Sequence, residues 1–243
     1  MRHTLKRLMF AATTTMALGL VASQPAYADM RLIITDSAGG SSYDSTYAGV
    51  FPAPGNFGWY TGTVALTNYT IDFTSEQENQ TASQGVLNFT GTVTKTNDAG
   101  GILTIRLIGN NYSLPGTAGS MFMFSTATGT GQGLVGNTTE TMTGYADQSN
   151  SLTPGVGVGS ATGSTTITDT TSAIPINNGS VAWTRLASAY SLESVLTLDM
   201  PNTIGGAAVS SSVSTFQTPE PASLVLLGTG LLATARRLRR KKN

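Results

Sequence analysis

The sequence predicts an all-β protein: an antiparallel β-sandwich of jelly-roll-like type, flanked by an N-terminal signal peptide and a short C-terminal transmembrane helix. Between residues 29 and 218, apolar residues alternate in short runs and show no sustained helical period. Gly, Asn and Pro interrupt these runs, as expected of turns between strands. Ser and Thr supply 55 of these 190 residues, and Thr is a good strand former.

Eight segments show the clearest strand pattern, and three more show a weaker one. The clear segments are 31–35, 58–66, 69–74, 85–94, 101–108, 121–125, 181–186 and 194–199, and the weaker ones are 140–145, 165–168 and 207–216. Two Gly-rich segments, 129–136 and 153–163, are predicted to be surface loops. Residues 205–218 are predicted to be either the last strand or a Ser/Gly linker.

A turn at 97–101 is predicted to join two of these strands as a hairpin. It contains Asn, Asp and Gly, which tolerate the positive φ that tight hairpins need. The residue pattern then places Val86, Leu87 and Phe89 opposite Ile102, Leu103 and Ile105.

The core of two packed sheets must come from the large apolar side chains of the body. We expect it to contain Trp59, Tyr60, Phe73, Phe89, Ile105, Phe122, Phe124, Trp183 and Leu196.

The composition of the body argues against several functions. The chain has no Cys, and its single histidine is His3, so the usual zinc ligands, the usual general base and a thiol nucleophile are missing. Residues 29–218 contain four basic and twelve acidic residues, a net charge of −8, which disfavours nucleic-acid binding. We therefore expect no catalytic residue, no metal and no cofactor, and a protein that is not an enzyme.

The first 28 residues have the pattern of a secretory signal peptide. A basic start is followed by an apolar run and by Ala26-Tyr27-Ala28, which fits the small-residue pockets of signal peptidase. We expect cleavage between Ala28 and Asp29.

The last 25 residues, 219–243, have three parts in a fixed order. Pro219-Glu220-Pro221 precedes a 14-residue apolar stretch at 222–235, and the basic residues of 236–243 follow, with Arg236, Arg237, Arg239 and Arg240 as the membrane stop. As a helix the stretch spans about 21 Å, less than the ~30 Å of a hydrocarbon core, so it is a marginal anchor. The positive-inside rule keeps the arginines in the cytoplasm and puts Pro219–Pro221 at the outer face of the inner membrane.

These three parts together resemble the PEP-CTERM sorting signal, a tail that some schemes call an ice-binding protein C-terminal domain. The resemblance implies recognition by exosortase, cleavage near Pro219–Pro221, and transfer to the cell surface or release. It also implies a host that makes exopolysaccharide or biofilm. The predicted organisation is a signal peptide at 1–28, a β-sandwich at 29–204, the strand or linker at 205–218 and the sorting signal at 219–243.

The hypothesis is an exported, non-enzymatic structural or adhesive component of an extracellular polysaccharide matrix. Its partners are signal peptidase, exosortase, the inner membrane as a transient anchor, and extracellular polysaccharide. The alternative is a secreted carbohydrate-binding module or a carboxylate-only glycoside hydrolase. Tyr43, Tyr47, Trp59 and Tyr60 could stack on sugars in that case, but we expect core or edge packing.

Ice binding is a minor alternative. It is suggested by Thr-x-Thr pairs, whose two side chains point to one face of a strand. The pairs are Thr61/Thr63, Thr92/Thr94, Thr94/Thr96, Thr141/Thr143 and Thr166/Thr168. No fixed repeat period accompanies them, as a flat ice-binding solenoid would need.

Overall fold

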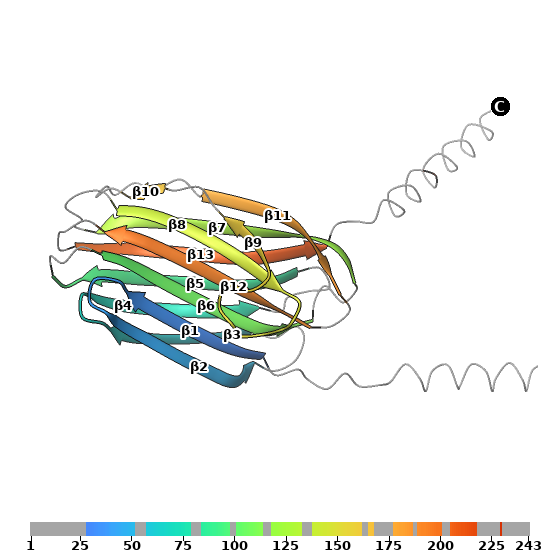
Figure 1. Cartoon of the computed structure of the whole chain (residues 1–243), viewed down its shortest axis with the longest axis horizontal. Coiled ribbons are helices and arrows are strands. Elements are labelled where there is room, and N and C mark those ends of the chain that lie inside the picture. Colours follow the sequence, from blue (N-terminus) through green and yellow to red (C-terminus); the bar gives the residue numbers. More distant parts are fainter. Residues whose placement is uncertain are drawn as a thin grey trace, which may run out of the picture.

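The body of the chain forms two antiparallel β-sheets with almost no helix among the described residues, consistent with a β-sandwich (Figure 1). The computed structural model describes residues 28–51, 57–78, 84–97, 101–113, 118–132, 138–161, 165–167, 177–186, 189–200, 205–217 and 229. Within these residues no helix is long and apolar enough to cross a membrane.

Sheet A has the order β10-β8-β12-β6-β1-β2, with β9 also paired to β8, and sheet B has the order β11-β7-β13-β5-β4-β3. From β5 to β8, consecutive strands alternate between the two sheets, and β11, β12 and β13 do so again. The strands are β1 (Ala28–Asp36), β2 (Ser41–Phe51), β3 (Phe57–Ala65), β4 (Tyr69–Glu78), β5 (Gln84–Lys95), β6 (Gly101–Tyr112), β7 (Gly119–Gln132), β8 (Thr138–Asp147), β9 (Val158–Ala161), β10 (Thr165–Ile167), β11 (Asn177–Arg185), β12 (Tyr190–Met200) and β13 (Gly205–Gln217).

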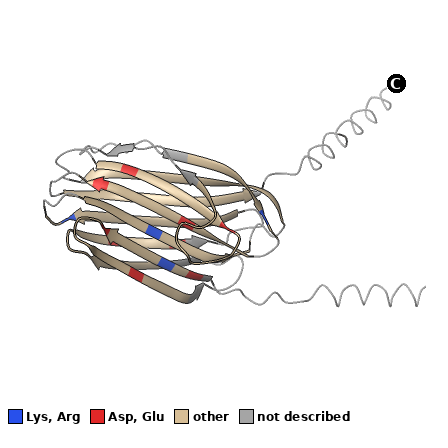
Figure 2. Ribbon diagram, in the orientation of Figure 1, with Lys and Arg blue, Asp and Glu red and all other residues tan. Residues whose placement is uncertain are grey.

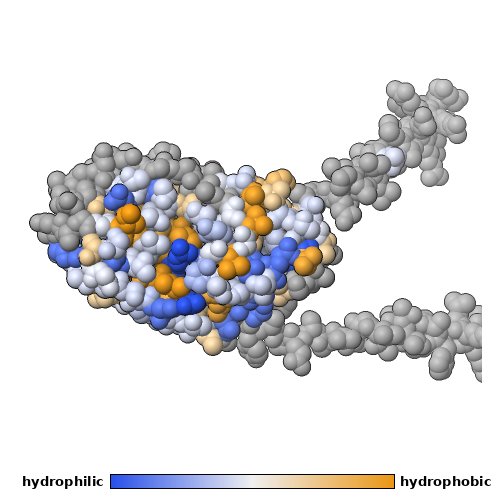
Figure 3. Space-filling view, in the orientation of Figure 1, coloured by the Kyte–Doolittle hydropathy of each residue, from blue (hydrophilic) through white to orange (hydrophobic). Residues whose placement is uncertain are grey.

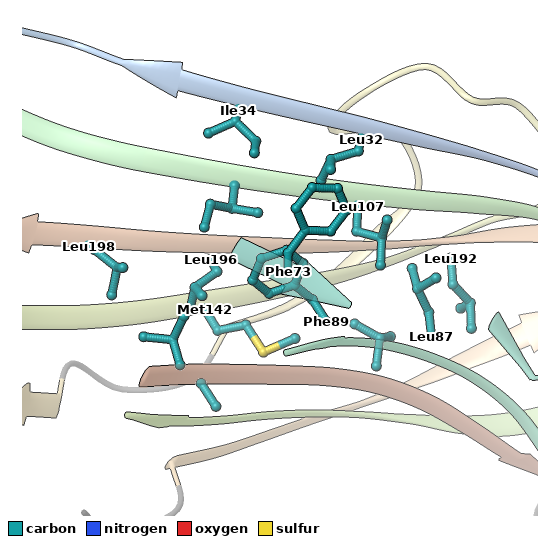
Figure 4. Packing of buried hydrophobic residues seen from close by; sticks show 14 of the residues in the cluster. Leu32, Ile34, Phe73, Leu87, Phe89, Leu107, Met142, Leu192, Leu196 and Leu198 are labelled. Carbon is teal, nitrogen blue, oxygen red and sulfur yellow. The ribbon is translucent and has the colours of Figure 1, made fainter. Parts of the chain in front are cut away.

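Alternate residues of the central strands point into one apolar core between the sheets. On β12, Leu192, Leu196 and Leu198 are fully buried, and on β5 Leu87 and Phe89 are buried as well. Figure 4 shows these side chains meeting Leu32, Ile34, Leu107 and Met142 between the layers. Burial of this apolar area is what holds the two sheets together.

Two buried hydrogen bonds between side chains also join the sheets across the core. The Tyr190 and Thr215 hydroxyls are 2.7 Å apart, and those of Ser194 and Ser211 are 2.8 Å apart. Since an unpaired buried hydroxyl is costly, each pair satisfies groups that the core would otherwise leave without a partner. These bonds fix β12 of sheet A over β13 of sheet B.

All eleven predicted strands are present, and two more were not predicted. β2 was missed because it is an edge strand whose inward side is mostly Tyr43, Ser45 and Tyr47 rather than aliphatic. β9 is a four-residue edge strand inside the predicted loop 153–163. The predicted loop at 129–136 is wrong in its first part, because β7 continues to Gln132. At 205–218 the structure has a strand, β13, in the middle of sheet B.

The predicted hairpin between residues 85–94 and 101–108 is wrong. β5 pairs with β4 and β13 in sheet B, whereas β6 pairs with β1 and β12 in sheet A. Leu87 and Phe89 therefore share the core with Leu103 and Ile105 from opposite sheets. Two strands with apolar faces can pair side by side in one sheet, or they can pack face to face from two sheets. The sequence pattern is the same in both cases, so it does not distinguish them.

Two of the predicted core residues lie outside the core. Phe122 and Phe124 are 40% and 38% exposed, because the inward positions of β7 belong to Met121 and Met123. Tyr60 is half-buried at the edge of the core. Phe73, Phe89, Ile105, Trp183 and Leu196 are buried as predicted, and the Trp59 side chain lies outside the described residues.

Core packing predicts a large difference between two leucines. Leu196→Ala removes a fully buried side chain and should lower the free energy of unfolding by about 2–5 kcal/mol. Leu186→Ala, at a position 59% exposed, should change it by less than about 0.5 kcal/mol. Urea unfolding followed by circular dichroism measures both, and equal effects would contradict the core described here.

Candidate functional site

The outer face of sheet A is partly covered by the chain itself. The segment 148–157 lies over β12, β6 and β1 and is held by polar contacts. Glu193, only 3% exposed, accepts hydrogen bonds from Arg106 Nη1 at 2.8 Å and from the Gly155 amide at 2.5 Å. Asn111 and Asn150 exchange two hydrogen bonds of 2.6 Å at the end of β6.

Four charged side chains of this face form two ion pairs. Arg31 forms an ion pair of 2.7 Å with Asp44, which holds the pKa of that carboxyl below its usual range, and also donates to the Leu152 carbonyl at 3.1 Å. Figure 3 shows this face, where hydrophilic and hydrophobic side chains are interspersed. Arg31 and Glu193 thus hold the covering segment, and each also pairs with a charged neighbour on this face.

The outer face of sheet B carries rows of hydroxyl groups that run across the strands. The strand pairing aligns one complete row of hydroxyl groups over five neighbouring strands, in the order β3, β4, β5, β13 and β7. This row is Thr61, Thr74, Thr90, Ser210 and Thr128. A second row, one pleat away, is Thr63, Asp72, Thr92, Ala208 and Thr130.

These two rows line an open groove of about 570 Å³. Between them, the inward positions alternate between glycine and a large residue: Gly62, Phe73, Gly91, Val209 and Gly129. A Cβ added at Gly91 would lie 2.8 Å from the Asp72 carbonyl oxygen, too close for any side chain. We attribute the hollow to these glycines. At three of the five inward positions beneath it there is no side chain, so the backbone can lie closer to the core there.

Two hydrogen bonds order the polar groups at the β3–β4 end of the groove. The Thr63 hydroxyl donates to Asp72 Oδ1 at 2.6 Å, and the Thr61 hydroxyl donates to the Phe73 carbonyl at 2.9 Å. With their protons engaged, both threonine oxygens present lone pairs to a ligand, while the other hydroxyls can donate or accept.

No cation lies in the groove. The body has four basic residues, and the structure describes all of them elsewhere. Arg31 and Arg106 are on sheet A, while Lys95 and Arg185 are buried. Charged residues are few over the whole sandwich, as the mostly tan ribbon of Figure 2 shows. The groove is therefore neutral except for Asp72.

An apolar cluster lies on the same face, towards the end where β13 finishes. Phe216 is in register with Phe122, and Phe124 is two residues further along β7. The Phe122 and Phe124 ring centroids are 6.2 Å apart, and those of Phe124 and Phe216 are 5.5 Å apart in a T-shaped contact. The outer face of sheet B thus has a hydroxyl-lined groove and, at one end, a phenylalanine patch.

The structure brings together some of the predicted site residues but not others. Two Thr-x-Thr pairs, Thr61/Thr63 and Thr92/Thr94, lie on this face, while Thr141/Thr143 is on the outer side of sheet A. Thr96 follows the end of β5, and the side chain of Thr166 lies outside the described residues.

Three of the four aromatic residues considered for sugar stacking pack within the protein instead, and the side chain of Trp59 lies outside the described residues. The Tyr47 and Tyr60 rings stack at 3.9 Å, and the Tyr43 and Tyr47 hydroxyls are 2.6 Å apart. Burial raises the pKa of Tyr47. The expected edge packing is therefore the arrangement seen for these three residues.

The predicted processing sites lie at or beyond the ends of the sandwich. Asp29 is in β1, with its amide donating to Asn110 Oδ1 at 2.7 Å, and Ala28 is the first residue of that strand. Ala26, Pro219, Glu220, Pro221 and the arginines at 236, 237, 239 and 240 lie outside the described residues. The start of β1 and the end of β13, to which the predicted leader and the tail are connected in sequence, share one end of the sandwich (Figure 1).

Sequence reasoning missed Thr74, Thr90, Thr128, Thr130 and Ser210 as members of one site. They come from four strands, and only the ladder pairing shows that they form rows. The alternation of polar and apolar residues on β4 and β13 signals that their polar side chains face outward, but not which strands are neighbours.

One buried carboxyl lies away from this face. Glu140 on β8 is 2% exposed, points into the sandwich, and its Oε1 atom has no hydrogen-bond partner among the described residues. Burial raises the pKa of Glu140 to about 7. In the part of the chain that the structure describes, no group of acidic or histidine side chains could hold a metal ion.

Comparisons with known proteins add to this description of an all-β body. Residues 217–241 match the model of the PEP-CTERM protein-sorting motif. The chain therefore carries this motif directly after β13, which indicates an exported protein sorted through a membrane-anchored C-terminal tail. No curated protein matches the sequence.

Several solved structures share a distant likeness with the chain. The enzymatically active domain of bacteriophage CBA120 tailspike protein 4 has 12% identity and a TM-score of 0.27; the match covers 62% of this chain and 18% of that domain. The mannan-recognising carbohydrate-binding module TmCBM27 has 11% identity and a TM-score of 0.31, with 66% and 89% covered. A family 11 carbohydrate-binding module from Clostridium thermocellum has 14% identity and a TM-score of 0.24, with 68% and 90% covered.

Glu140 predicts a pH dependence of stability. Its pKa is about 7 when folded against 4.5 ordinarily, so its contribution is fully present below pH 4.5 and is lost as pH rises to about 7. The loss over this window is of order 3 kcal/mol. Glu140→Gln, which keeps the shape and removes the titration, should flatten the profile over this window. Unfolding curves at several pH values measure it, with Glu76→Gln as control; parallel profiles for wild type and Glu140→Gln would contradict the burial effect.

Proposed function

We propose that this protein is an exported, exosortase-sorted surface or matrix component, and that its β-sandwich binds a neutral polysaccharide through the groove of sheet B without catalysing a reaction. The observation that carries the proposal is the row of five hydroxyl groups from Thr61 to Thr128. The alternation of strands between the sheets also favours a jelly-roll arrangement, a fold that presents one sheet as an open face.

The groove suits a polyhydroxylated chain. Its rows cross five strands, four interstrand spacings or about 19 Å, so they present repeated hydrogen-bonding groups to an extended polymer. Thr and Ser hydroxyls both donate and accept, as sugar hydroxyls do, which allows paired hydrogen bonds along the contact. Its volume of about 570 Å³ is in the range of ligand-binding clefts.

Electrostatics favours a neutral polysaccharide over an acidic one. The groove holds Asp72 and none of the four cations of the body. A polymer of uronic acids or sulfated sugars would meet like charge there and in the net −8 of the body. The ligand class is therefore a glycan without negative charge.

The described carboxylates of this face do not suit glycoside hydrolysis. Asp72 and Glu76 both lie on the outer side of β4, four residues apart, so their Cα atoms are about 13 Å apart. This backbone spacing is wider than the about 5–9.5 Å that separates the two carboxyl groups of glycoside hydrolases. Binding without turnover is thus the function that this face supports best. Ice binding is less well supported, because the threonine rows line a hollow and include a carboxylate.

The hydroxyl row predicts loss of binding when its middle is removed. The triple variant Thr74→Val, Thr90→Val and Ser210→Ala should weaken binding to a neutral polysaccharide at least about tenfold, since each lost hydrogen bond contributes ~0.5–1.5 kcal/mol. Affinity electrophoresis or calorimetry against the host's own polysaccharide and a panel of neutral and acidic glycans measures this.

A matched control is available on the other sheet. Thr104, Thr197 and Thr141 form an equivalent row on the outer side of sheet A, so changing all three to Val removes as many hydroxyls at the same kind of position. This control should bind as the wild type does. Equal binding by both triple variants, or turnover of the glycan, would refute the proposal.

The sorting motif predicts a trapped precursor. Glu220→Gln should leave the protein in the inner membrane with its basic tail, because the proposed exosortase site is altered while export and the apolar stretch are not. Fractionation of the host and mass spectrometry of the C-terminus measure this, with Glu76→Gln as control. Release of Glu220→Gln at the wild-type level, or surface material still ending in Lys242-Asn243, would count against exosortase sorting.

A further inference from the structure

We propose that the phenylalanine patch, Phe122, Phe124 and Phe216, contacts the lipid surface while the precursor is anchored by its tail, and so holds the sandwich against the membrane. This rests on the sorting step proposed above and is independent of what the groove binds. It assigns a role to exposed apolar side chains that the glycan groove does not use.

The patch lies at the end of the sandwich from which the tail departs. Phe216 is the penultimate residue of β13, and Phe122 is paired with it across the ladder. Leu186, 59% exposed, directly follows β11, whose last residue pairs with Gly119 at the start of β7. The exposed apolar side chains of β7 and of the end of β11 thus gather near the exit of the chain.

The length of the connecting chain keeps this end close to the bilayer. Only the four residues 218–221 separate β13 from the apolar stretch at 222–235. Fully extended they reach about 14 Å, and the headgroup layer occupies about 5–8 Å of that on one side. The end of β13 therefore stays within about 6–9 Å of the outer edge of the headgroups. Tethering at this distance makes even a small apolar patch effective.

The shape of the patch favours lipid over sugar. Stacking along a glycan needs ring faces that lie roughly in one plane, but Phe122 and Phe124 are inclined by 41° and Phe124 and Phe216 by 78°. The inclined, partly exposed rings present apolar edges as well as faces, which suits contact with lipid at the headgroup boundary.

Electrostatic attraction does not explain a contact between this end of the sandwich and the membrane. The body is acidic, and near this end Arg185 is buried, with its guanidinium donating to the Ser113 carbonyl at 2.9 Å. A bacterial membrane with anionic lipids would repel such a body. The contact we propose is therefore apolar and does not require anionic lipid.

The absence of cysteine from the chain allows a direct test. The full chain is reconstituted in vesicles of phosphatidylethanolamine and phosphatidylglycerol, carrying a single polarity-sensitive fluorophore at F124C or at I102C. Ile102 is a matched control, because it is similarly exposed at 42% but lies at the start of β6, at the opposite end of the sandwich. Replacing the acyl chains by brominated ones should quench the F124C probe several-fold more than the I102C probe.

A second variant tests whether the phenyl groups cause the contact. A probe at S180C, in register with Phe124 on β11, should be quenched in the wild-type background and at least twofold less when F122S and F124S are added. Both phenylalanines are partly exposed, so the double variant should keep its circular dichroism spectrum and melting temperature. Equal quenching of F124C and I102C, or unchanged quenching of S180C in the double variant, would overturn the proposal.

A further experiment with a neutral polysaccharide tests the alternative that the phenylalanine patch binds sugar. If a neutral polysaccharide, rather than brominated lipid, changes the F124C emission, the patch is an extension of the groove and the lipid contact is wrong. Groove binding and tail cleavage are measured by other variants, so a failure here leaves both of those proposals intact.

Discussion

The antiparallel pairing of β13 with both β5 and β7 is the constraint on which the rest of the structure depends. It places Val209 and Val213 in the core, and the alternation of the strand then obliges Ser210 and Phe216 to face outward. The same strand thus closes the core, completes the hydroxyl row and ends at the sorting motif. A slip of one residue would turn Ser210 inward and expose Val209 and Val213, so the core and the groove are fixed by a single register.

The two faces of the sandwich differ because their outward side chains find different partners. On sheet A, Arg31 and Glu193 bind the segment 148–157, which covers part of that face, and Arg106 pairs with Glu193. On sheet B the outward side chains of the middle strands are mostly short hydroxyl residues, and the glycines beneath them let the sheet form a hollow. Short side chains leave room for a ligand, and their hydroxyl groups supply the hydrogen bonds. The same Thr and Ser residues therefore account for both the open groove and its polarity.

Local pattern predicted the strands well and their neighbours poorly. The period-two alternation of β12 and β13 can be read from the sequence, but the pairing of β5 with β13 spans more than a hundred residues and leaves no local signature. Phe122 and Phe124 were placed in the core because Met121-Phe122-Met123-Phe124 is apolar on both sides of the strand. In such a run the pattern does not indicate which side of the strand faces the core. The methionines pack inward in the structure, and the phenylalanines therefore face outward. The tail, by contrast, is a short linear motif and needed no tertiary information.

The position of the tail gives the exposed phenylalanines a physical rationale. An apolar cluster on a secreted domain carries a risk of self-association, which would ordinarily disfavour it. Here only four residues separate the last strand from an apolar stretch, so the lipid contact that we propose would cover the cluster while the tail is present. The hydroxyl row further along the same strands does not depend on this contact. The division of one sheet into an apolar end and a polar groove then follows from the two roles that we propose for it, a lipid contact in the anchored precursor and a glycan-binding surface.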